Sequence, residues 1–170
     1  VWGEVRSASE SKTKVIATYK ESTLSAEELS KGNLQHGRQL FNKQCAGCHV
    51  LFGQGRKLGP DLTGSQRKNI DYLLENLVDP SAVVAADFKA ATVIMADGRS
   101  IQGVIARTND RTITLQTKDQ DLTVDRQEIE EIQTTGVSLM PEGILDSLAK
   151  EEVRDLVAYL MADHQVQADP

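Results

Sequence analysis

The sequence predicts a mainly α-helical domain with an inserted small antiparallel β subdomain, which is an α+β fold. Apolar residues recur at intervals of three and four between about residues 33 and 78 and again after residue 150, a spacing typical of amphipathic helices. Between about residues 87 and 135 they alternate with polar residues, as in strands with one buried face. We expect an N-terminal extension or linker at 1–30, one domain at 31–162 with the β insertion at about 86–135, and a C-terminal tail at 163–170.

The composition limits the class of protein. The chain has 170 residues, with 19 Lys and Arg against 25 Asp and Glu, and a formal net charge of −6. This length fits one domain or two small ones, and the acidic balance argues against a general nucleic-acid binder. No apolar run approaches the roughly 20 residues of a membrane span. Aromatic residues make up only 4% of the chain, so we expect another group to complete the core.

The first 30 residues mix charged and small polar residues with scattered apolar ones such as Trp2, which predicts a tail or linker. Because the chain starts at Val1 rather than Met, we expect it to be a processed or excised segment of a longer protein.

Three helices are predicted beyond this segment. The first starts near Asn33, runs into Cys45, and has one apolar face formed by Leu34, Gly37, Leu40 and Phe41. The second follows a glycine-rich loop and ends at Asp79-Pro80. The third follows the loop at 138–143, and its apolar stripe consists of Val153, Leu156, Val157 and Leu160.

The β insertion is predicted to contain five short strands. Apolar residues alternate on both sides of Asp97-Gly98, a two-residue hairpin signal. Three further alternating runs follow, separated by turns, and together they fit a small barrel or a strongly twisted sheet. Six Lys and Arg against nine Asp and Glu between residues 83 and 136 argue against RNA binding by this segment.

The strongest chemical signal is Cys45-Ala46-Gly47-Cys48-His49, the C-x-x-C-H attachment signature of c-type haem. Two thiols three residues apart on a helical turn can form thioethers to both haem vinyl groups, and the next residue presents an imidazole to the iron. Cys45 and Cys48 are the only cysteines, so they serve local chemistry rather than a disulfide framework. One covalent haem c would also supply the core that the scarce aromatics do not.

Three other interpretations of the motif carry less weight. A structural zinc site needs four ligands, and only His36 and His164 remain beside His49. A thioredoxin-like redox pair would need a strand–turn–helix context, whereas a helix precedes these cysteines. The third alternative is a chance match without a ligand.

A distal ligand to the haem iron would come from Met95, Met140, Met161, His36 or His164. Met140 is favoured because it lies in a loop and because Pro141 restricts it to extended backbone. Met95 alternates within a strand and Met161 trails the last helix, positions typical of core or surface residues. A thioether favours ferrous iron, so His49 with Met140 points to an electron carrier.

These residues together resemble a class I cytochrome c. The likeness rests on Gly37-x-x-x-Phe41, Gly59-Pro60-Asp61-Leu62, Met140-Pro141 and Leu156-Val157-Ala158-Tyr159-Leu160. It implies that the first and last helices cross closely at Gly37 and pack through Phe41 and Tyr159. It also implies that the carbonyl of Pro60 accepts a hydrogen bond from the His49 imidazole.

The sequence is most similar to the C-terminal haem-binding domains of large planctomycete and verrucomicrobial proteins, over about residues 33–162. The shared stretches are Leu58–Gly64, Leu77–Ser81, Asp97–Arg99 and Met140–Gly143. This resemblance implies a parent chain with a dehydrogenase-like region and a periplasmic or equivalent compartment. One departure is Ala149, where such helices often place a Ser or Thr cap, and Ser147 is the alternative cap.

We therefore expect a c-type cytochrome domain that transfers single electrons and is not itself catalytic. Its partner would be a separate redox protein or the dehydrogenase portion of its own parent chain, with no nucleic acid involved, and the chain could form a homodimer. The alternative is a haem enzyme or a gas or redox sensor with an open or displaceable distal site.

Two further expectations concern the surroundings of the haem. Arg67 is the best candidate to neutralise haem propionates, within a basic cluster that also contains Arg56, Lys57 and Lys68. The β insertion would either pack near the haem edge or serve docking or dimerisation, and the sequence favours neither.

Overall fold

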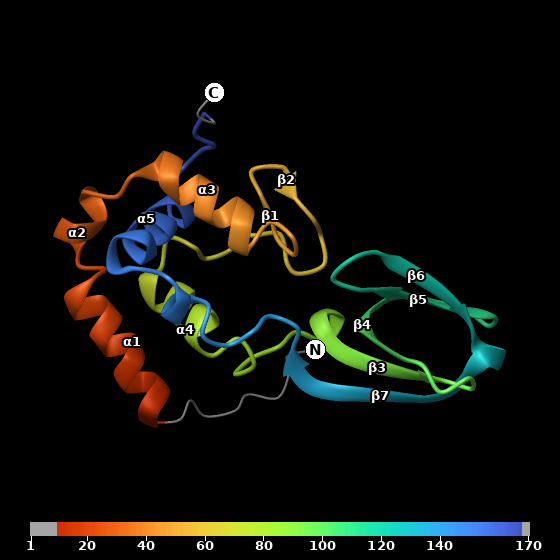
Figure 1. Cartoon of the computed structure of the whole chain (residues 1–170). Helices are drawn as coiled ribbons and strands as arrows, with labels where there is room; N and C mark the ends of the chain where they lie inside the picture. The colour runs from red at the N-terminus through yellow and green to blue at the C-terminus, as the bar shows by residue number, and fades with distance from the viewer. Residues whose placement is uncertain (1–9, 168–170) are drawn as a thin grey trace. The chain divides into compact units, whose positions relative to one another are not determined.

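The computed structural model describes residues 10–167, which divide into two compact units (Figure 1). One unit, called the β unit here, consists of Val83–Met140. The other, called the helical unit, combines the described residues before and after it. Trp2 and the end of the predicted C-terminal tail lie outside the described residues.

The helical unit contains the three predicted helices and two more. Its elements are α1 (Glu10–Ser22), α2 (Ala26–Ser30), α3 (Leu34–Gln44), the short strands β1 (Val50–Leu51) and β2 (Gln54–Gly55), α4 (Ile70–Val78), the 3-10 turn η3 (Leu145–Ser147) and α5 (Lys150–Leu160). None of the helices within residues 10–167 is long and apolar enough to cross a membrane.

Polar caps fix where the predicted helices begin. The side chain of Asn33 accepts hydrogen bonds from two backbone N–H groups at the start of α3, and Asn69 does the same for α4. At the start of α5, the carboxylate of Glu152 accepts a hydrogen bond of 2.8 Å from the N–H of Ala149. Ser147 is not the cap, because its hydroxyl instead donates to the carbonyl of Ile144 at 2.9 Å.

The segment expected to be a tail or linker is largely helical where it is described. It forms α1 and α2, and Leu24 between them is only 4% exposed. The sequence pattern missed α1 because this helix buries no residue of its own. Its described contacts are polar and reach α4 and the segment 142–146, for instance from Lys12 and Tyr19.

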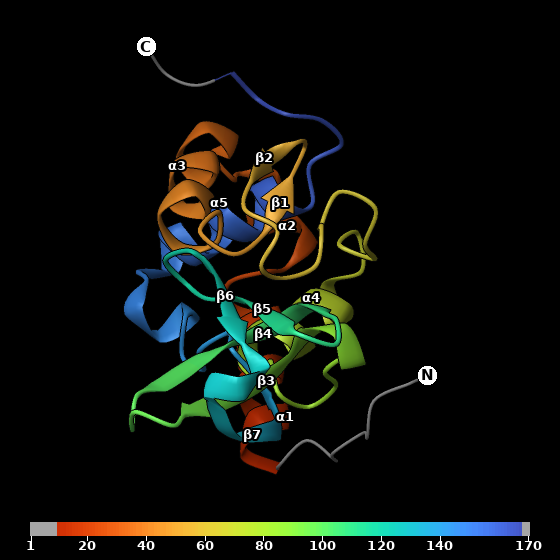
Figure 2. The ribbon, with the colours of Figure 1, turned by 90° about the vertical axis from the view of Figure 1, so that its right-hand side faces the viewer.

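The helices α3 and α5 cross in close contact, as the family resemblance implied (Figure 2). A Cβ atom on Gly37 would lie 2.1 Å from the carbonyl oxygen of Asp155 and 2.6 Å from the Cβ of Tyr159. The rings of Phe41 and Tyr159 pack beside this point with their centroids 5.8 Å apart, and each residue is 1% exposed. Only a residue without a side chain allows this separation of the two helices.

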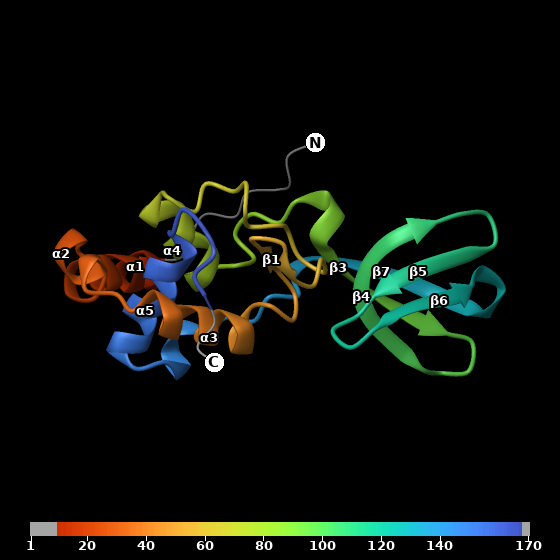
Figure 3. The same ribbon diagram turned by 90° about the horizontal axis from the view of Figure 1, so that it is seen from above.

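The β unit forms the five predicted strands (Figure 3). They are β3 (Lys89–Met95), β4 (Ser100–Thr108), β5 (Thr112–Gln116), β6 (Asp121–Asp125) and β7 (Ile129–Ser138), with 3-10 turns η1 (Ala86–Phe88) and η2 (Arg126–Glu128). All pairs are antiparallel, in the order β6-β5-β4-β3-β7. The last strand extends to Ser138, beyond the predicted end of the sheet.

Turn chemistry and an apolar cluster define this sheet. Gly98 has a φ of 86°, which the Asp97-Gly98 hairpin between β3 and β4 requires. The core of the unit consists of Val93, Met95, Ile113 and Leu115, each at most 2% exposed. Of the two positions expected for Met95, core or surface, the structure shows the core.

The proportions of the fold differ from the prediction in one respect. Helix accounts for 37% and strand for 25% of the described residues, so the description of the fold as mainly α is not confirmed. The expectation of helices with a separate antiparallel sheet is confirmed. The excess of strand comes from β4 and β7, which have 9 and 10 residues and are longer than the short strands predicted.

Candidate functional site

The Cys45–His49 motif forms a tight turn directly after α3. The N–H of Cys45 still donates to the carbonyl of Phe41 at 2.8 Å, and the N–H groups of Cys48 and His49 donate to the carbonyl of Cys45 at 3.0 and 2.8 Å. Both cysteines are free thiols, with Cys45 buried and Cys48 half-buried. The turn therefore brings two thiols and one imidazole together at the end of a helix that is anchored against α5.

Burial controls the protonation of the first thiol. Desolvation, with a smaller contribution from the neighbouring Cys48, raises the pKa of Cys45 to about 12. Before haem is attached, burial therefore favours the neutral thiol of Cys45 over the thiolate that redox-sensor cysteines use.

The backbone that follows the motif folds back over it. Gly55 has a φ of 110°, and a Cβ atom there would lie 2.1 Å from the carbonyl oxygen of His49. The N–H groups of Leu58 and Gly59 both donate to the carbonyl of Cys48, at 3.0 and 2.7 Å. The loop thus encloses the motif with backbone hydrogen bonds, and its close approach to His49 explains the glycine at position 55.

The imidazole of His49 is oriented by the backbone eleven residues later in the chain. Its Nδ1 lies 2.9 Å from the carbonyl oxygen of Pro60, the contact that the resemblance implied. Because a carbonyl can only accept, Nδ1 carries the proton and Nε2 keeps a free lone pair. Burial lowers the pKa of His49, and the hydrogen bond to Pro60 offsets part of this effect. A neutral imidazole with one available nitrogen is the form that binds a metal.

Gly59 allows the backbone to pass directly beside this ring. A Cβ atom on Gly59 would lie 2.7 Å from Cε1 of His49 and 3.0 Å from its Nδ1. The ring can move only if this loop moves with it, so a side chain at this position would displace the imidazole.

Arg67 has partners other than the expected propionates. Its side chain is buried, and its guanidinium donates to the backbone carbonyls of Leu160, at 2.8 Å, and Ala162. It also lies over the ring of Phe52, with 4.8 Å from the guanidinium carbon to the ring centroid. These contacts tie the loop after the motif to the end of α5. They support a structural role, and the propionate role of Arg67 stays a prediction.

Phe52 is a site residue that the sequence analysis did not single out. It has a φ of 51°, and its ring lies edge-on to Tyr159, with 6.2 Å between the centroids. The sequence could have pointed to Phe52, because a single large aromatic residue in a glycine-rich loop usually packs against another part of the protein.

The candidates for the distal ligand occupy different surroundings. Met140 is half-buried at the end of the β unit, and its N–H donates to the hydroxyl of Ser138 at 3.1 Å. Met161 is the half-buried C-cap of α5, and His164 is exposed. Met95 lies in the core of the β unit. The choice of Met140 stays a prediction from its loop position and from Pro141.

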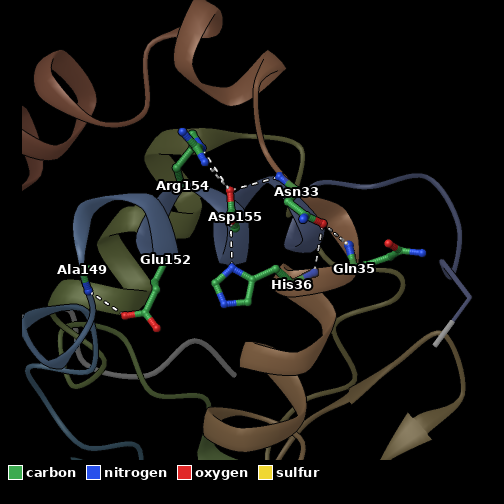
Figure 4. Close-up of polar contacts among 7 residues, drawn as sticks. All are labelled: Asn33, Gln35, His36, Ala149, Glu152, Arg154 and Asp155. Carbon is green, nitrogen blue, oxygen red and sulfur yellow. Dashed lines mark hydrogen bonds and ion pairs between the residues drawn. The ribbon is translucent and has the colours of Figure 1, made fainter. Parts of the chain in front are cut away.

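His36 belongs to a polar cluster between α3 and α5 (Figure 4). Its Nδ1 lies 2.9 Å from Oδ2 of Asp155, while Oδ1 of Asp155 accepts hydrogen bonds from the N–H of Asn33 and from Arg154. Burial raises the pKa of Asp155, but the hydrogen bonds from His36, Asn33 and Arg154 outweigh it and hold the pKa below its ordinary value. The cluster joins the helix that carries the motif to the last helix, which is a structural role for His36.

A metal centre built from protein ligands alone is not found in the described part of the chain. Residues 10–167 contain no group of three or more His, Cys, Asp or Glu side chains that could hold a metal ion. The two thiols and the oriented imidazole of the motif are therefore the chemistry that a cofactor would use.

A comparison with protein families places most of the chain within one of them. The family model described as cytochrome c matches residues 34–162. No curated protein matches the chain.

Proposed function

Since the chain belongs to the cytochrome c family, whose members carry covalently attached haem c, we propose that it transfers single electrons through one haem ligated by His49 and Met140. The observation that carries this proposal is the arrangement of the motif: two thiols on one turn and an imidazole whose Nε2 is left available by the hydrogen bond to Pro60.

The residues of the helical unit fit this cofactor. Cys45 and Cys48 are unpaired thiols in the spacing that two thioether bonds need. Gly59 lets the backbone lie against the His49 ring, and the hydrogen bond from Nδ1 to Pro60 leaves the lone pair of Nε2 for the iron. When bound, haem c supplies an iron that alternates between the ferrous and ferric states.

The protein's own contribution to electron transfer is to keep the iron ligands fixed. Pro60 holds the orientation and the tautomer of His49, which limits rearrangement when the charge on the iron changes. Two further contacts fix the segments on either side of the motif. Gly37 lets α3, which precedes the motif, pack closely on α5, and the hydrogen bonds of Arg67 tie the loop after the motif to the end of α5. A site of this rigidity suits a carrier that must change charge without changing shape.

Met140 is proposed as the second ligand because of its chain context. Pro141 restricts its backbone, and a thioether stabilises ferrous iron, which raises the reduction potential relative to two histidines. His36 has a buried carboxylate as its partner instead.

The partner and the compartment are proposed from the same resemblance. Cytochrome c domains typically act outside the cytoplasm with redox partners, and we place this one in the periplasm or an equivalent compartment. Its electron donor would be a dehydrogenase-like portion of a parent chain of the planctomycete and verrucomicrobial type, or a separate redox enzyme. Electron uptake by the full-length parent protein, with and without the Cys45→Ala, Cys48→Ala double variant, tests the former.

The test of the ligand pair is the absorption spectrum of the ferric protein, made in a host with the c-type haem attachment machinery. We expect a weak long-wavelength sulfur-to-iron band that disappears in Met140→Ala. Met95→Leu and Met161→Leu are matched controls and should retain it. If the band is absent from the unchanged protein while haem stays covalently attached, the His49–Met140 pair is wrong. The iron is then five-coordinate or has two nitrogen ligands, and the alternative of an enzyme or sensor with an open or displaceable distal site is favoured.

A further inference from the structure

The helix α1 holds the segment that follows Met140 through two polar contacts within the helical unit. The ammonium of Lys12 donates to Oε1 of Glu142 at 2.8 Å. About two turns further along the same face of the helix, the hydroxyl of Tyr19 donates to Oδ1 of Asp146 at 3.4 Å. The helix that the sequence analysis missed is therefore linked to the loop that carries the proposed ligand.

Lys12 makes this contact from a fixed position. The same ammonium donates to Oδ1 of Asp79 at 2.7 Å, and Asp79 is the C-cap of α4 with a side chain only 8% exposed. The hydrogen bonds to Asp79 and Glu142 raise the pKa of Lys12, so it stays charged throughout the physiological range. A buried carboxylate needs a cation beside it, which keeps the ammonium in place for Glu142.

The segment is anchored on its other side as well. Leu145 is 2% exposed, and the N–H of Asp146 donates to the carbonyl of Gly143 at 3.1 Å, which closes a turn. Glu142 lies between this anchored turn and Met140, and Pro141 removes one backbone rotation from the connection. Holding Glu142 therefore limits how far the backbone of Met140 can travel.

We propose that Lys12 is a positioning residue for the distal ligand: it holds Glu142 to the end of α4 and thereby keeps Met140 on the iron. This inference rests on the proposed function, because it takes Met140 as the ligand. It gives α1 a role in setting how readily the sixth position opens.

The experiment measures imidazole binding to the ferric protein, because imidazole can bind the iron only after the distal ligand has left. Glu142→Ala removes the contact to the loop and leaves the ion pair of Lys12 with Asp79 intact. Lys12→Met removes both contacts, and Lys12→Arg is the conservative variant. The matched control is Lys20→Met, which breaks the 2.5 Å ion pair of Lys20 with Asp71, also between α1 and α4, without touching the loop.

The expected result is an increase in apparent imidazole affinity of about two- to five-fold for Glu142→Ala and Lys12→Met, the factor that corresponds to one partly exposed ion pair. Lys12→Arg should restore the affinity of the unchanged protein, and Lys20→Met should not alter it. A merely stabilising role for α1 would give Lys20→Met and Glu142→Ala the same effect.

The spectrum of Met140→Ala distinguishes failure of the positioning role of Lys12 from failure of the proposed His49–Met140 ligand pair. If Met140→Ala removes the sulfur-to-iron band but Glu142→Ala and Lys12→Met bind imidazole like Lys20→Met, the positioning role is overturned and the ligand pair stands. If the unchanged protein has no such band, or Met140→Ala retains it, the ligand pair is wrong and the positioning role falls with it.

Discussion

The close crossing of α3 and α5 makes Gly37 a position where one added methyl group should be costly. In Gly37→Ala the new Cβ would lie 2.1 Å from the carbonyl oxygen of Asp155 and 2.6 Å from the Cβ of Tyr159. Neither neighbour is the flexible end of a side chain, so the two helices must move apart. The movement would loosen the Phe41–Tyr159 contact and the hydrogen bonds around Asp155.

The magnitude follows from two opposing effects. Overpacking a filled contact costs about 3 kcal/mol at the upper end of its usual range, which applies because backbone must shift. Replacing glycine by alanine within a helix returns about 1 kcal/mol. The net loss in the free energy of unfolding is therefore about 2 kcal/mol, equivalent to a fall in melting temperature of about 4–8 °C for a chain of this size.

The assay is thermal and denaturant unfolding of the haem-loaded protein, followed by the circular dichroism of the haem so that the helical unit is observed. Gly64→Ala is the control, because a Cβ atom there meets nothing within 4 Å. Its stability should stay within about 0.5 kcal/mol of the unchanged protein. The reasoning is refuted if Gly37→Ala is as stable as Gly64→Ala.

Three further predictions follow from the same structure. Asp155→Asn should lower the free energy of unfolding by about 2 kcal/mol near pH 7. Because the folded-state pKa of Asp155 lies below its ordinary value of 3.8, the carboxylate stabilises the fold above that pH, and this stabilisation is lost as pH falls through the folded-state pKa. When unfolding is measured from pH 6 to pH 3, the free energy of unfolding should therefore fall less steeply in the variant than in the unchanged protein. Arg67→Met should destabilise by about 2 kcal/mol, since it leaves the carbonyls of Leu160 and Ala162 without their donor, and an unaltered melting temperature would exclude the structural role. Gly59→Ala should displace the His49 ring and change the visible spectrum of the haem-loaded protein, whereas Gly64→Ala should leave that spectrum unchanged.

The sequence predicted correctly those helices and strands in which the spacing of apolar residues and the capping or turn residues indicate the same element. The helices α3, α4 and α5 have apolar stripes that are buried in the structure, and side chains such as Asn33 and Asn69 fix the starts of two of them. The five strands were equally clear, because alternation and turn residues coincide at Asp97-Gly98 and at the later turns. Periodicity is informative wherever one face of an element is buried.

The parts that were missed depend on polar contacts between segments far apart in the chain. The helix α1 has no apolar stripe, and its contacts run from Lys12 to Asp79 and Glu142, 67 and 130 residues away. Two of the carbonyls that accept from Arg67 lie 93 and 95 residues away, and no local pattern reveals them. The hydrogen bond of His49 to Pro60 was found because the motif and the proline lie close together in a recognisable family pattern.

The most direct test of single-electron transfer by a haem with two protein ligands is a spectroelectrochemical titration of the haem-loaded protein, followed by addition of carbon monoxide to the ferrous form. The account predicts one reversible one-electron step and a ferrous spectrum that carbon monoxide does not change, because Met140 occupies the sixth position. In Met140→Ala the potential should fall and carbon monoxide should bind. Stoichiometric binding of carbon monoxide to the unchanged protein would contradict the account and would identify an enzyme or sensor with an open distal site.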